Sequence, residues 1–199
     1  MATTFHLIRH GSYPLLGRTL AGRMPGLSLS PAGRAEAEAV AARLAPRGLV
    51  AVVASPRERT METAAPIAAR CGLSVTPDSD LDEVAFGAWT GQDFPALAGD
   101  PAWRAFNDVR SLAPIPGGET MVAVQARAVG ALLRWQAALP DAEIALVSHG
   151  DVIKAVLLHA LGAPLDMIHR IDISPASRSV LVLDRVSVQV RALNLPAGA

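Results

Sequence analysis

Leu7-Ile8-Arg9-His10-Gly11 closes the first apolar run of the sequence, which begins at Thr3. An apolar run of this length is typical of a β-strand buried on both faces, as in parallel sheets. In α/β proteins the reactive side chains lie just beyond the carboxyl ends of such strands. Arg9 carries a fixed positive charge, His10 can act as a neutral nucleophile near pH 7, and Gly11 lets the backbone turn sharply near a ligand. The stretch therefore predicts a parallel α/β sheet with a reactive site at the end of its first strand.

The composition is that of one globular domain with a substantial core. The chain has 199 residues, of which 51% are hydrophobic and 18% charged, and its 18 basic and 18 acidic residues cancel. We therefore predict a single domain over residues 1–199, with no nucleic-acid partner and no membrane partner. Cys71 is the only cysteine, which excludes an internal disulfide and a cysteine metal cluster.

The apolar segments do not have the pattern of targeting or membrane-spanning sequences. No basic and apolar leader opens the sequence, so we expect a cytoplasmic protein. The most apolar tract, Ile144 to Leu161, is interrupted by Ser148-His149-Gly150-Asp151 and by Lys154. This indicates a buried strand followed by a helix rather than a membrane span.

The order of the predicted elements indicates a three-layer α/β/α sandwich, with a mostly parallel sheet that can carry an antiparallel edge strand. Ser30 and Pro31 fit an N-cap and a first helical position, so we expect a helix over 31–44. The segment 81–116 is predicted to be an insertion that covers the site. Further strands are expected at 49–54, 73–76 and 143–148, further helices at 119–139 and 151–161, and closing strands at 168–173, 179–183 and 186–192.

Two later positions in the chain repeat the chemistry of the first strand end. Ser55 is predicted to cap a helix that starts at Pro56, with Arg59 in its first turn, where free N–H groups and the helix dipole attract anions. His149 and Gly150 follow the strand expected at 143–148. Three strand ends thus bring two arginines and two histidines to one edge of the sheet.

Such a cluster suits a phosphoryl group. The two arginines, Arg9 and Arg59, supply fixed cationic donors for its oxygens, and the imidazole of His10 can attack phosphorus in line. A carboxylic acid with a raised pKa can protonate the leaving oxygen and later deprotonate water. Glu83, beside the covering segment, is the best-placed carboxyl group. No cofactor or metal is required, and no metal-ligand spacing is present in the sequence.

Five motifs in order make the chain resemble the histidine phosphatase superfamily, also called the phosphoglycerate mutase-like family. They lie at Leu7–Gly11, Ser55–Ala64, Leu81–Gly91, Pro116–Thr120 and Val147–Gly150. The resemblance covers nearly the whole chain.

The resemblance implies that His10 is the phosphorylated nucleophile and that Arg9, Arg59 and His149 form the phosphate pocket. It also implies that Glu83 is the proton donor, and the register of the motif favours Glu83 over its neighbour Asp82. Three further residues adjoin these positions and are assigned to substrate binding with Arg9 and Arg59: Gly11, Ser12 and Gly150.

We therefore predict a metal-independent phosphomonoesterase that hydrolyses a small phosphorylated metabolite through a phosphohistidine. One alternative is a 2,3-bisphosphoglycerate-dependent phosphoglycerate mutase. It is disfavoured because Ser12 and Leu16 replace polar residues of the mutases, and because the chain is short after Glu83. The other alternative is a non-catalytic phospholigand-binding protein, which would need neither nucleophile nor acid. The physiological substrate and the oligomeric state stay open, and a homodimer is one of the states considered.

Several residues keep two interpretations at this point. Arg57 can belong to the pocket rim or to the solvent-exposed surface, and Glu119 can be a helix-start acid or a site residue. Arg18 and Arg23 can reach an anionic substrate tail or be solvated. Packing is expected for Phe86, Trp89, Trp103 and Phe106, with substrate contact left open for the last two, and structural roles are expected for His6, His159 and His169.

Overall fold

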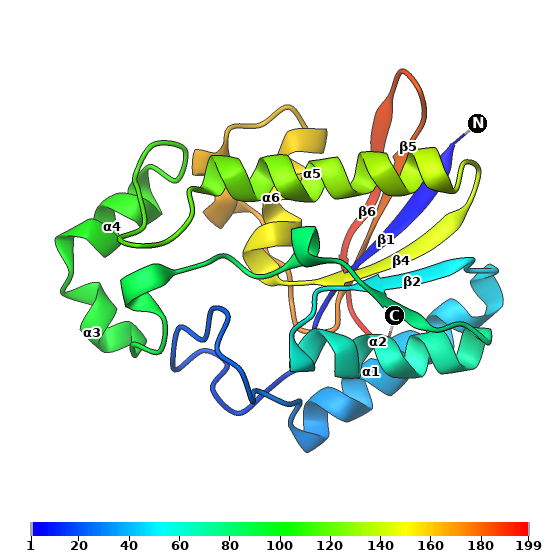
Figure 1. Cartoon of the computed structure of the whole chain (residues 1–199), viewed down its shortest axis with the longest axis horizontal. Helices are drawn as coiled ribbons and strands as arrows, with labels where there is room; N and C mark the ends of the chain where they lie inside the picture. Colours follow the sequence, from blue (N-terminus) through cyan, green and yellow to red (C-terminus); the bar gives the residue numbers. More distant parts are fainter. Residues whose placement is uncertain (1, 199) are drawn as a thin grey trace.

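A single sheet of six strands forms the centre of this computed structural model, which describes residues 2–198 (Figure 1). The strand order is β3-β2-β4-β1-β5-β6. β3, β2, β4 and β1 run parallel, whereas β5 and β6 are antiparallel to their neighbours. The mostly parallel sheet with an antiparallel edge is therefore confirmed. The strand bounds are β1 Thr3–Arg9, β2 Ala51–Ala54, β3 Val75–Pro77, β4 Glu143–Ser148, β5 Arg178–Leu183 and β6 Val188–Leu195.

Four helices cover the two faces of the sheet (Figure 1). α1 (Pro31–Leu44) and α2 (Glu58–Cys71) lie on one face, and α5 (Met121–Ala138) and α6 (Gly150–Ala160) lie on the other. Alternate side chains of β1 enter the two resulting cores, since Ile8 packs with the α1–α2 layer and Phe5 and Leu7 pack with the α5–α6 layer. Because both faces of the sheet are buried, its strands appear in the sequence as continuous apolar runs.

The start of α1 agrees with the sequence expectation. Oγ of Ser30 accepts a hydrogen bond from N of Gly33 at 3.1 Å, and Pro31 occupies the first helical position. The backbone of Ser12 lies beside this helix, and a Cβ on Gly33 would lie 2.0 Å from the carbonyl oxygen of Ser12. The glycine therefore lets the chain after β1 approach α1 closely.

The segment 81–116 lies beyond the sheet, at the left of Figure 1, and contains α3 (Phe94–Ala98) and α4 (Pro101–Asp108). Its core is aromatic, because the ring of Trp89 lies 5.2 Å from that of Trp103 and 5.4 Å from that of Phe106. An isolated bridge between Thr19 and Asp93 joins this segment to the loop that follows β1. Two loops that are far apart in sequence thus lie side by side at the end of the sheet.

The strand expected at 168–173 is wrong. Residues Leu165–Arg170 form a 3₁₀ helix, η4, in which Leu165 and Ile168 are buried at the three-residue spacing of this helix. Both sides of β1 are taken by β4 and β5, and the apolar side chains of this stretch are buried by packing on the core next to α6 instead of by strand pairing. The closing strands expected at 179–183 and 186–192 form as β5 and β6, which pair as a hairpin, with Asp184 accepting three hydrogen bonds from Val186 and Ser187 in its turn. No helix among residues 2–198 is both long enough and apolar enough to cross a membrane.

Candidate active site

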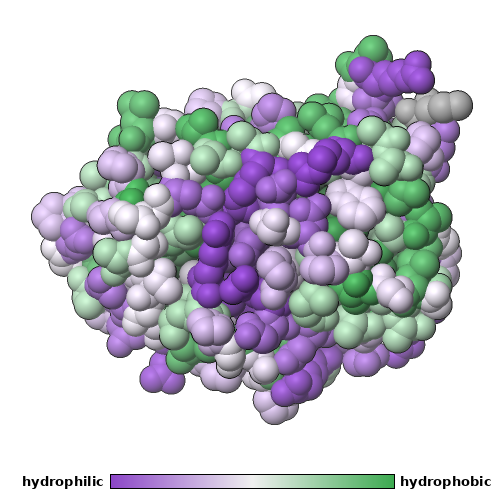
Figure 2. Space-filling view, in the orientation of Figure 1, coloured by the Kyte–Doolittle hydropathy of each residue, from purple (hydrophilic) through white to green (hydrophobic). Residues whose placement is uncertain are grey.

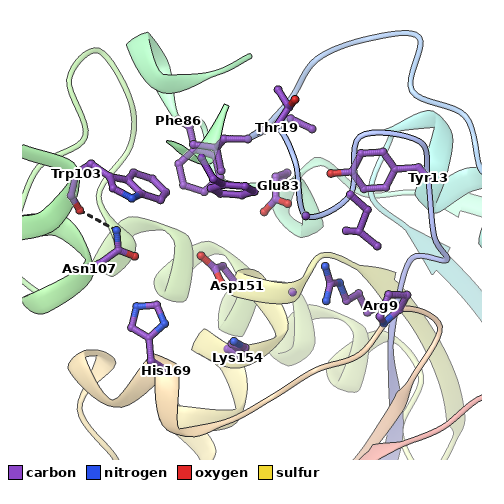
Figure 3. A pocket seen from close by; sticks show the side chains of 18 of the residues that line it. Arg9, Tyr13, Thr19, Glu83, Phe86, Trp103, Asn107, Asp151, Lys154 and His169 are labelled. Carbon is purple, nitrogen blue, oxygen red and sulfur yellow. Dashed lines mark hydrogen bonds between the residues drawn. The ribbon is translucent and has the colours of Figure 1, made fainter. Parts of the chain in front are cut away.

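A cleft of about 490 Å³ opens at the carboxyl ends of β1 and β4 (Figure 3). Its walls come from the loop after β1, the segment 81–116, the first turns of α6, and η4. Arg9 and Glu83 line the cleft, and three buried residues lie directly behind them: His10, Arg59 and His149. We call the part of the cleft next to these five residues the inner end. The outer end is the part around Asn107, Arg110, Asp151, Lys154 and His169.

Parallel pairing of β1 with β4 brings the two predicted histidines together. Arg9 is paired with Ser148, so the next residue on each strand is a histidine. The amide of His10 donates to the carbonyl of Ser148 at 3.0 Å, and the imidazole rings of His10 and His149 lie 5.2 Å apart. Both side chains are buried, with exposed fractions of 2% and 0%.

His10 is held in the tautomer that a nucleophile requires. Its Nδ1 lies 2.8 Å from the carbonyl oxygen of Gly11. A carbonyl oxygen can only accept, so Nδ1 carries the hydrogen and the lone pair is on Nε2. Burial, reinforced by the charges of Arg59 and Arg9, lowers the pKa of His10 well below its ordinary value of 6.5. The imidazole is therefore neutral near pH 7, with Nε2 free to attack.

Arg9 and Arg59 carry unpaired N–H groups beside this histidine. Nη2 of Arg59 donates to the carbonyl of Gly22 at 2.7 Å, and Nη1 of Arg9 donates to that of Ile173 at 2.6 Å. However, Nε of Arg9 and both Nε and Nη1 of Arg59 are buried without a hydrogen-bond partner. Buried cationic donors without partners are costly, and an anion in the cleft would satisfy them.

Glu83 is the carboxyl group that faces the inner end (Figure 3). Its Oε2 lies 3.4 Å from Nδ1 of His149 and 3.8 Å from Nη2 of Arg59. Burial raises the pKa of Glu83 to about 7, the charge of Arg59 opposes this rise, and the carboxylate of Asp151 adds to it. A carboxyl group that titrates near neutral pH can both give and take a proton.

Asp82 has a different environment from Glu83, although the two residues are adjacent. Its Oδ1 accepts from the amide of Glu83 at 2.8 Å and from Oγ of Ser55 at 3.1 Å. It also forms ion pairs with Arg57 at 3.1 Å and with Arg23 at 3.5 Å. Its oxygens are thus occupied by protein donors.

His149 is oriented by Ser55. Nε2 of His149 lies 2.8 Å from Oγ of Ser55, whose hydroxyl proton is donated to Asp82. Oγ must therefore accept from Nε2–H of His149, which leaves Nδ1 as the acceptor for Nη2 of Arg59 at 3.2 Å. Burial, together with the charge of Arg59, keeps the pKa of His149 well below 6.5.

Because the hydroxyl of Ser55 is hydrogen-bonded to His149, one expectation about the fold is wrong. Ser55 does not cap α2 and Pro56 does not start it, because the helix begins at Glu58 with Arg57 as its N-cap residue. Arg59 still lies in the first turn. Arg57 pairs with Asp82 and donates to the carbonyl of Arg23 at 3.2 Å, so its interactions are with the protein at the rim of the site.

The predicted binding residues near Gly11 have internal partners. The amide of Gly11 donates to Thr63 at 3.0 Å, and a Cβ at this position would lie 2.6 Å from the carbonyl oxygen of Gly33. The amide and hydroxyl of Ser12 donate to Glu36 at 2.8 and 2.9 Å. Gly150, in contrast, lines the cleft, and a Cβ there would lie 3.4 Å from Nε of Arg9.

The sequence indicated only some of the residues in the hydrogen-bond network that supports Glu83. Glu119 accepts hydrogen bonds from the amide of Ala85, from Arg23 and from Arg127. The carbonyl of Glu83 accepts from Arg23 at 2.7 Å and from Arg127 at 3.2 Å. Glu119 and Arg23 therefore support the loop that carries Glu83. A band of hydrophilic residues crosses the centre of the face shown in Figure 2. Sequence reasoning missed Arg127, which lies two helical turns beyond Glu119.

At the outer end of the cleft, substrate contact was considered from the sequence for Trp103 but not for the polar residues. Asn107, Arg110, Asp151, Lys154 and His169 line this end together with Phe86 and Trp103 (Figure 3), whereas Tyr13 lies at the inner end, 5.4 Å from the ring of His10. A structural role in a strand was expected for His169, but this residue lies on η4 and lines the cleft. The spacing of Asp151 and Lys154 after Gly150, which puts them on one face of α6, was the available signal. Among residues 2–198, no group of three His, Cys, Asp or Glu side chains could hold a metal ion.

Comparison with known proteins agrees with this geometry. The family described as the histidine phosphatase superfamily (branch 1) matches residues 5–196. An uncharacterized protein of Mycobacterium tuberculosis is 39% identical over 166 residues, covering 82% of this chain and 81% of that protein. The glucosyl-3-phosphoglycerate phosphatase of Mycolicibacterium vanbaalenii is 34% identical over 173 residues, covering 80% of this chain and 75% of that protein. The solved native structure of a mycobacterial glucosyl-3-phosphoglycerate phosphatase has a TM-score of 0.88 at 26% identity, covering 98% of this chain and 100% of that chain.

Proposed function

This chain belongs to the histidine phosphatase superfamily, and we propose that it hydrolyses phosphate monoesters of small metabolites through a phosphohistidine at Nε2 of His10. The observation that carries the proposal is the neutral, Nδ1-anchored imidazole of His10 beside the unpaired buried donors of Arg9 and Arg59. A nucleophile and fixed positive charge at one point are what phosphoryl transfer needs.

In the first step the phosphoryl oxygens accept hydrogen bonds from the guanidinium groups of Arg9 and Arg59. Nε2 of His10 attacks phosphorus, the P–N bond forms, and the bond from phosphorus to the ester oxygen breaks. The protonated carboxyl of Glu83 gives its proton to the departing oxygen. The negative charge of the bound phosphate favours a proton on Nδ1 of His149, which would add a third cation to the pocket.

In the second step water replaces the alcohol. The carboxylate of Glu83 takes a proton from the water, whose oxygen attacks phosphorus while the P–Nε2 bond breaks. Inorganic phosphate leaves, and His10 and Glu83 return to their starting states. The positive charge for both steps comes from Arg9 and Arg59, so the proposed reaction is independent of metal ions and cofactors.

The relatives support a small phosphorylated substrate, because the curated proteins of similar sequence include a glucosyl-3-phosphoglycerate phosphatase. Leu16 lines the cleft as an apolar side chain, which favours hydrolysis over the mutase reaction predicted as an alternative. Residues 81–116 supply one wall of the cleft as an insertion within the single domain. A cytoplasmic location, the absence of nucleic-acid and membrane partners, and a homodimer stay predictions.

The test is hydrolysis of para-nitrophenyl phosphate in the presence of EDTA, with the wild type beside His10→Ala. We expect EDTA-resistant turnover that is lost in the variant, and a phosphate on His10 detected by mass spectrometry after an alkaline quench. Undiminished turnover by His10→Ala would refute the mechanism, and loss of turnover in EDTA would refute metal independence. Activation by added 2,3-bisphosphoglycerate would support the mutase alternative.

A further inference from the structure

The outer end of the cleft has two chemically different walls. Phe86, Phe94 and Trp103 from the segment 81–116 form an apolar wall. The opposite wall is polar, with Asp151 and Lys154 from α6 and His169 from η4 (Figure 3). A ligand that extends from the inner end therefore meets aromatic rings on one side, with Asn107 beside Trp103, and charged side chains on the other.

Among the described residues, Lys154 is the cation of this wall without a direct partner, although its charge acts on the nearby carboxylate of Asp151 and helps to lower the pKa of that group. It forms no hydrogen bond and no ion pair within 4.0 Å with any residue in the described part of the chain, and it lines the cleft half-buried. It is also the only lysine of a chain whose other basic residues are all arginines. A lysine ammonium is a compact charge on a flexible stem, which suits an acidic group whose position varies by a few bonds.

The neighbouring charges are already compensated. Nη1 of Arg110 donates to Asp151 at 2.8 Å, its Nη2 donates to Asn107 at 2.8 Å, and its guanidinium lies over the ring of Phe106 at 4.1 Å. Burial, together with the charge of Arg110, lowers the pKa of His169 below 6.5, so this imidazole is neutral near pH 7. One net positive charge, that of Lys154, is left at the outer end.

The distance along α6 relates this charge to the phosphate site. Gly150 lies against Arg9 at the inner end, and Lys154 follows four residues later. At 1.5 Å per residue, the two positions are separated by roughly 6 Å along the helix. In Figure 3 Lys154 accordingly lies between Arg9 and His169.

We propose that Lys154 binds a second acidic group of the substrate, so that the preferred substrates are phosphomonoesters whose alcohol part carries a carboxylate or a further phosphate within a few bonds of the ester. This inference rests on the proposed phosphatase function and specifies its substrate class. The apolar wall of Phe86, Phe94 and Trp103 then contacts the part of the substrate between the two anions.

The binding test compares pairs of non-hydrolysable phosphonates. Carboxyalkyl phosphonates and alkyl phosphonates of the same chain length are titrated calorimetrically into the wild type, Lys154→Met and Lys154→Arg. In the wild type we expect the carboxylate to tighten binding about tenfold at the best chain length, in keeping with one partly desolvated charge pair. Lys154→Met should abolish this gain, and Lys154→Arg should keep most of it. Arg185→Met, which removes an exposed charge outside the cleft, is the matched control and should change neither affinity.

The kinetic arm uses 3-phosphoglycerate and glycerol 3-phosphate, which differ only in a carboxylate and a hydroxymethyl group. Lys154→Met should lower kcat/KM about tenfold for the first substrate only, with para-nitrophenyl phosphate hydrolysis changed less than about twofold. Equal loss for all three substrates would assign Lys154 a structural role and overturn the proposal, as would a carboxylate gain that survives in Lys154→Met. His10-dependent hydrolysis of para-nitrophenyl phosphate without Lys154-dependent selectivity would refute this inference alone. Failure to bind any phosphonate would refute the proposed function as well.

Discussion

The inner and outer ends of the cleft are built in different ways. At the inner end His10, Arg59 and His149 are at most 2% exposed, and they project from strand ends and the first turn of a helix, where backbone pairing fixes their positions. At the outer end Lys154 is half-buried and His169 is exposed, and the facing wall is a loop-rich segment. In the proposed mechanism, rigid elements hold the groups that act on phosphorus, which every substrate shares, whereas the outer end would contact the part that differs between substrates. Variants at the inner end should therefore lower activity on every phosphomonoester, whereas variants at the outer end should change the preference among substrates.

The largest effect is expected for His10→Ala. Loss of Nε2 removes the nucleophile, so kcat should fall at least about 10⁴-fold with every phosphomonoester. Steady-state rates on one aryl and one alkyl phosphate measure this, and the thermal unfolding of the variant serves as the control for folding. A loss confined to one substrate would contradict the assignment of His10 to the shared chemistry.

Arg59→Gln should be the next most severe change. It removes the charge whose Nε and Nη1 are buried without partners, and one such donor to a developing oxyanion is worth about 10²–10³-fold in rate. The same factor is expected for aryl and alkyl phosphates, and binding of inorganic phosphate, followed by calorimetry, should weaken in parallel. Phosphate affinity equal to that of the wild type would show that the anion binds elsewhere.

Glu83→Gln should separate substrates by their leaving group. Alkoxides need a proton on departure, so kcat/KM should fall about 10²–10³-fold for alkyl phosphates, but less than about tenfold for para-nitrophenyl phosphate. Equal losses with both classes would argue against Glu83 as the acid.

The pH dependence sharpens the same test. The acid form of Glu83 is lost as the pH rises through about 7, so kcat/KM of the wild type on alkyl phosphates should decline there, and the decline should be absent from Glu83→Gln. At Glu83 the folded state also binds more protons than the unfolded state between about pH 4.5 and 7, so the contribution of this group to the free energy of unfolding falls as the pH rises through this window. Glu83→Gln should therefore unfold at a higher temperature than the wild type at pH 8. A lower temperature would show that the buried carboxylate stabilises the fold.

The smallest effect is expected for Asp151→Asn, which tests the electrostatic interaction between the outer and the inner end. Asp151 belongs to the outer end, yet its charge raises the pKa of Glu83. Asp151→Asn removes this negative charge and leaves Arg110 unpaired, and both changes favour the ionised form of Glu83. The decline of the pH profile should move to lower pH by roughly half a unit. An unchanged profile would show that the two ends are electrostatically independent.

Several features of the fold followed from local chemistry. The continuous apolar runs of β1 and β4 predicted a sheet covered on both faces, and Ser30-Pro31 predicted the start of α1. Parallel strands end at the same edge of a sheet, so the sequence alone was enough to place Arg9, His10 and His149 together, although they are distant along the chain. Such patterns are informative because strand burial and helix capping depend on a few adjacent residues.

Other features depended on partners that the sequence pattern does not identify. Ser55 was expected to cap a helix, but its hydroxyl binds His149 and Asp82, from two other segments. Residues 168–173 have a strand-like composition, but both sides of β1 are taken by β4 and β5, and the 3₁₀ helix Leu165–Arg170 brings His169 to the cleft.

The sequence alone therefore determined which reactive residues follow each element: an arginine and a histidine at the end of β1, an arginine at the start of α2 and a histidine after β4. Only the tertiary structure decided the protonation of these groups and the shape of the outer end. The pKa of Glu83 depends on its burial and on charges from three other segments. Lys154 is left without a direct partner in the described part of the chain because the nearby carboxylate of Asp151 accepts its hydrogen bond from Arg110. Motifs are local, whereas desolvation and charge compensation are properties of the packed molecule.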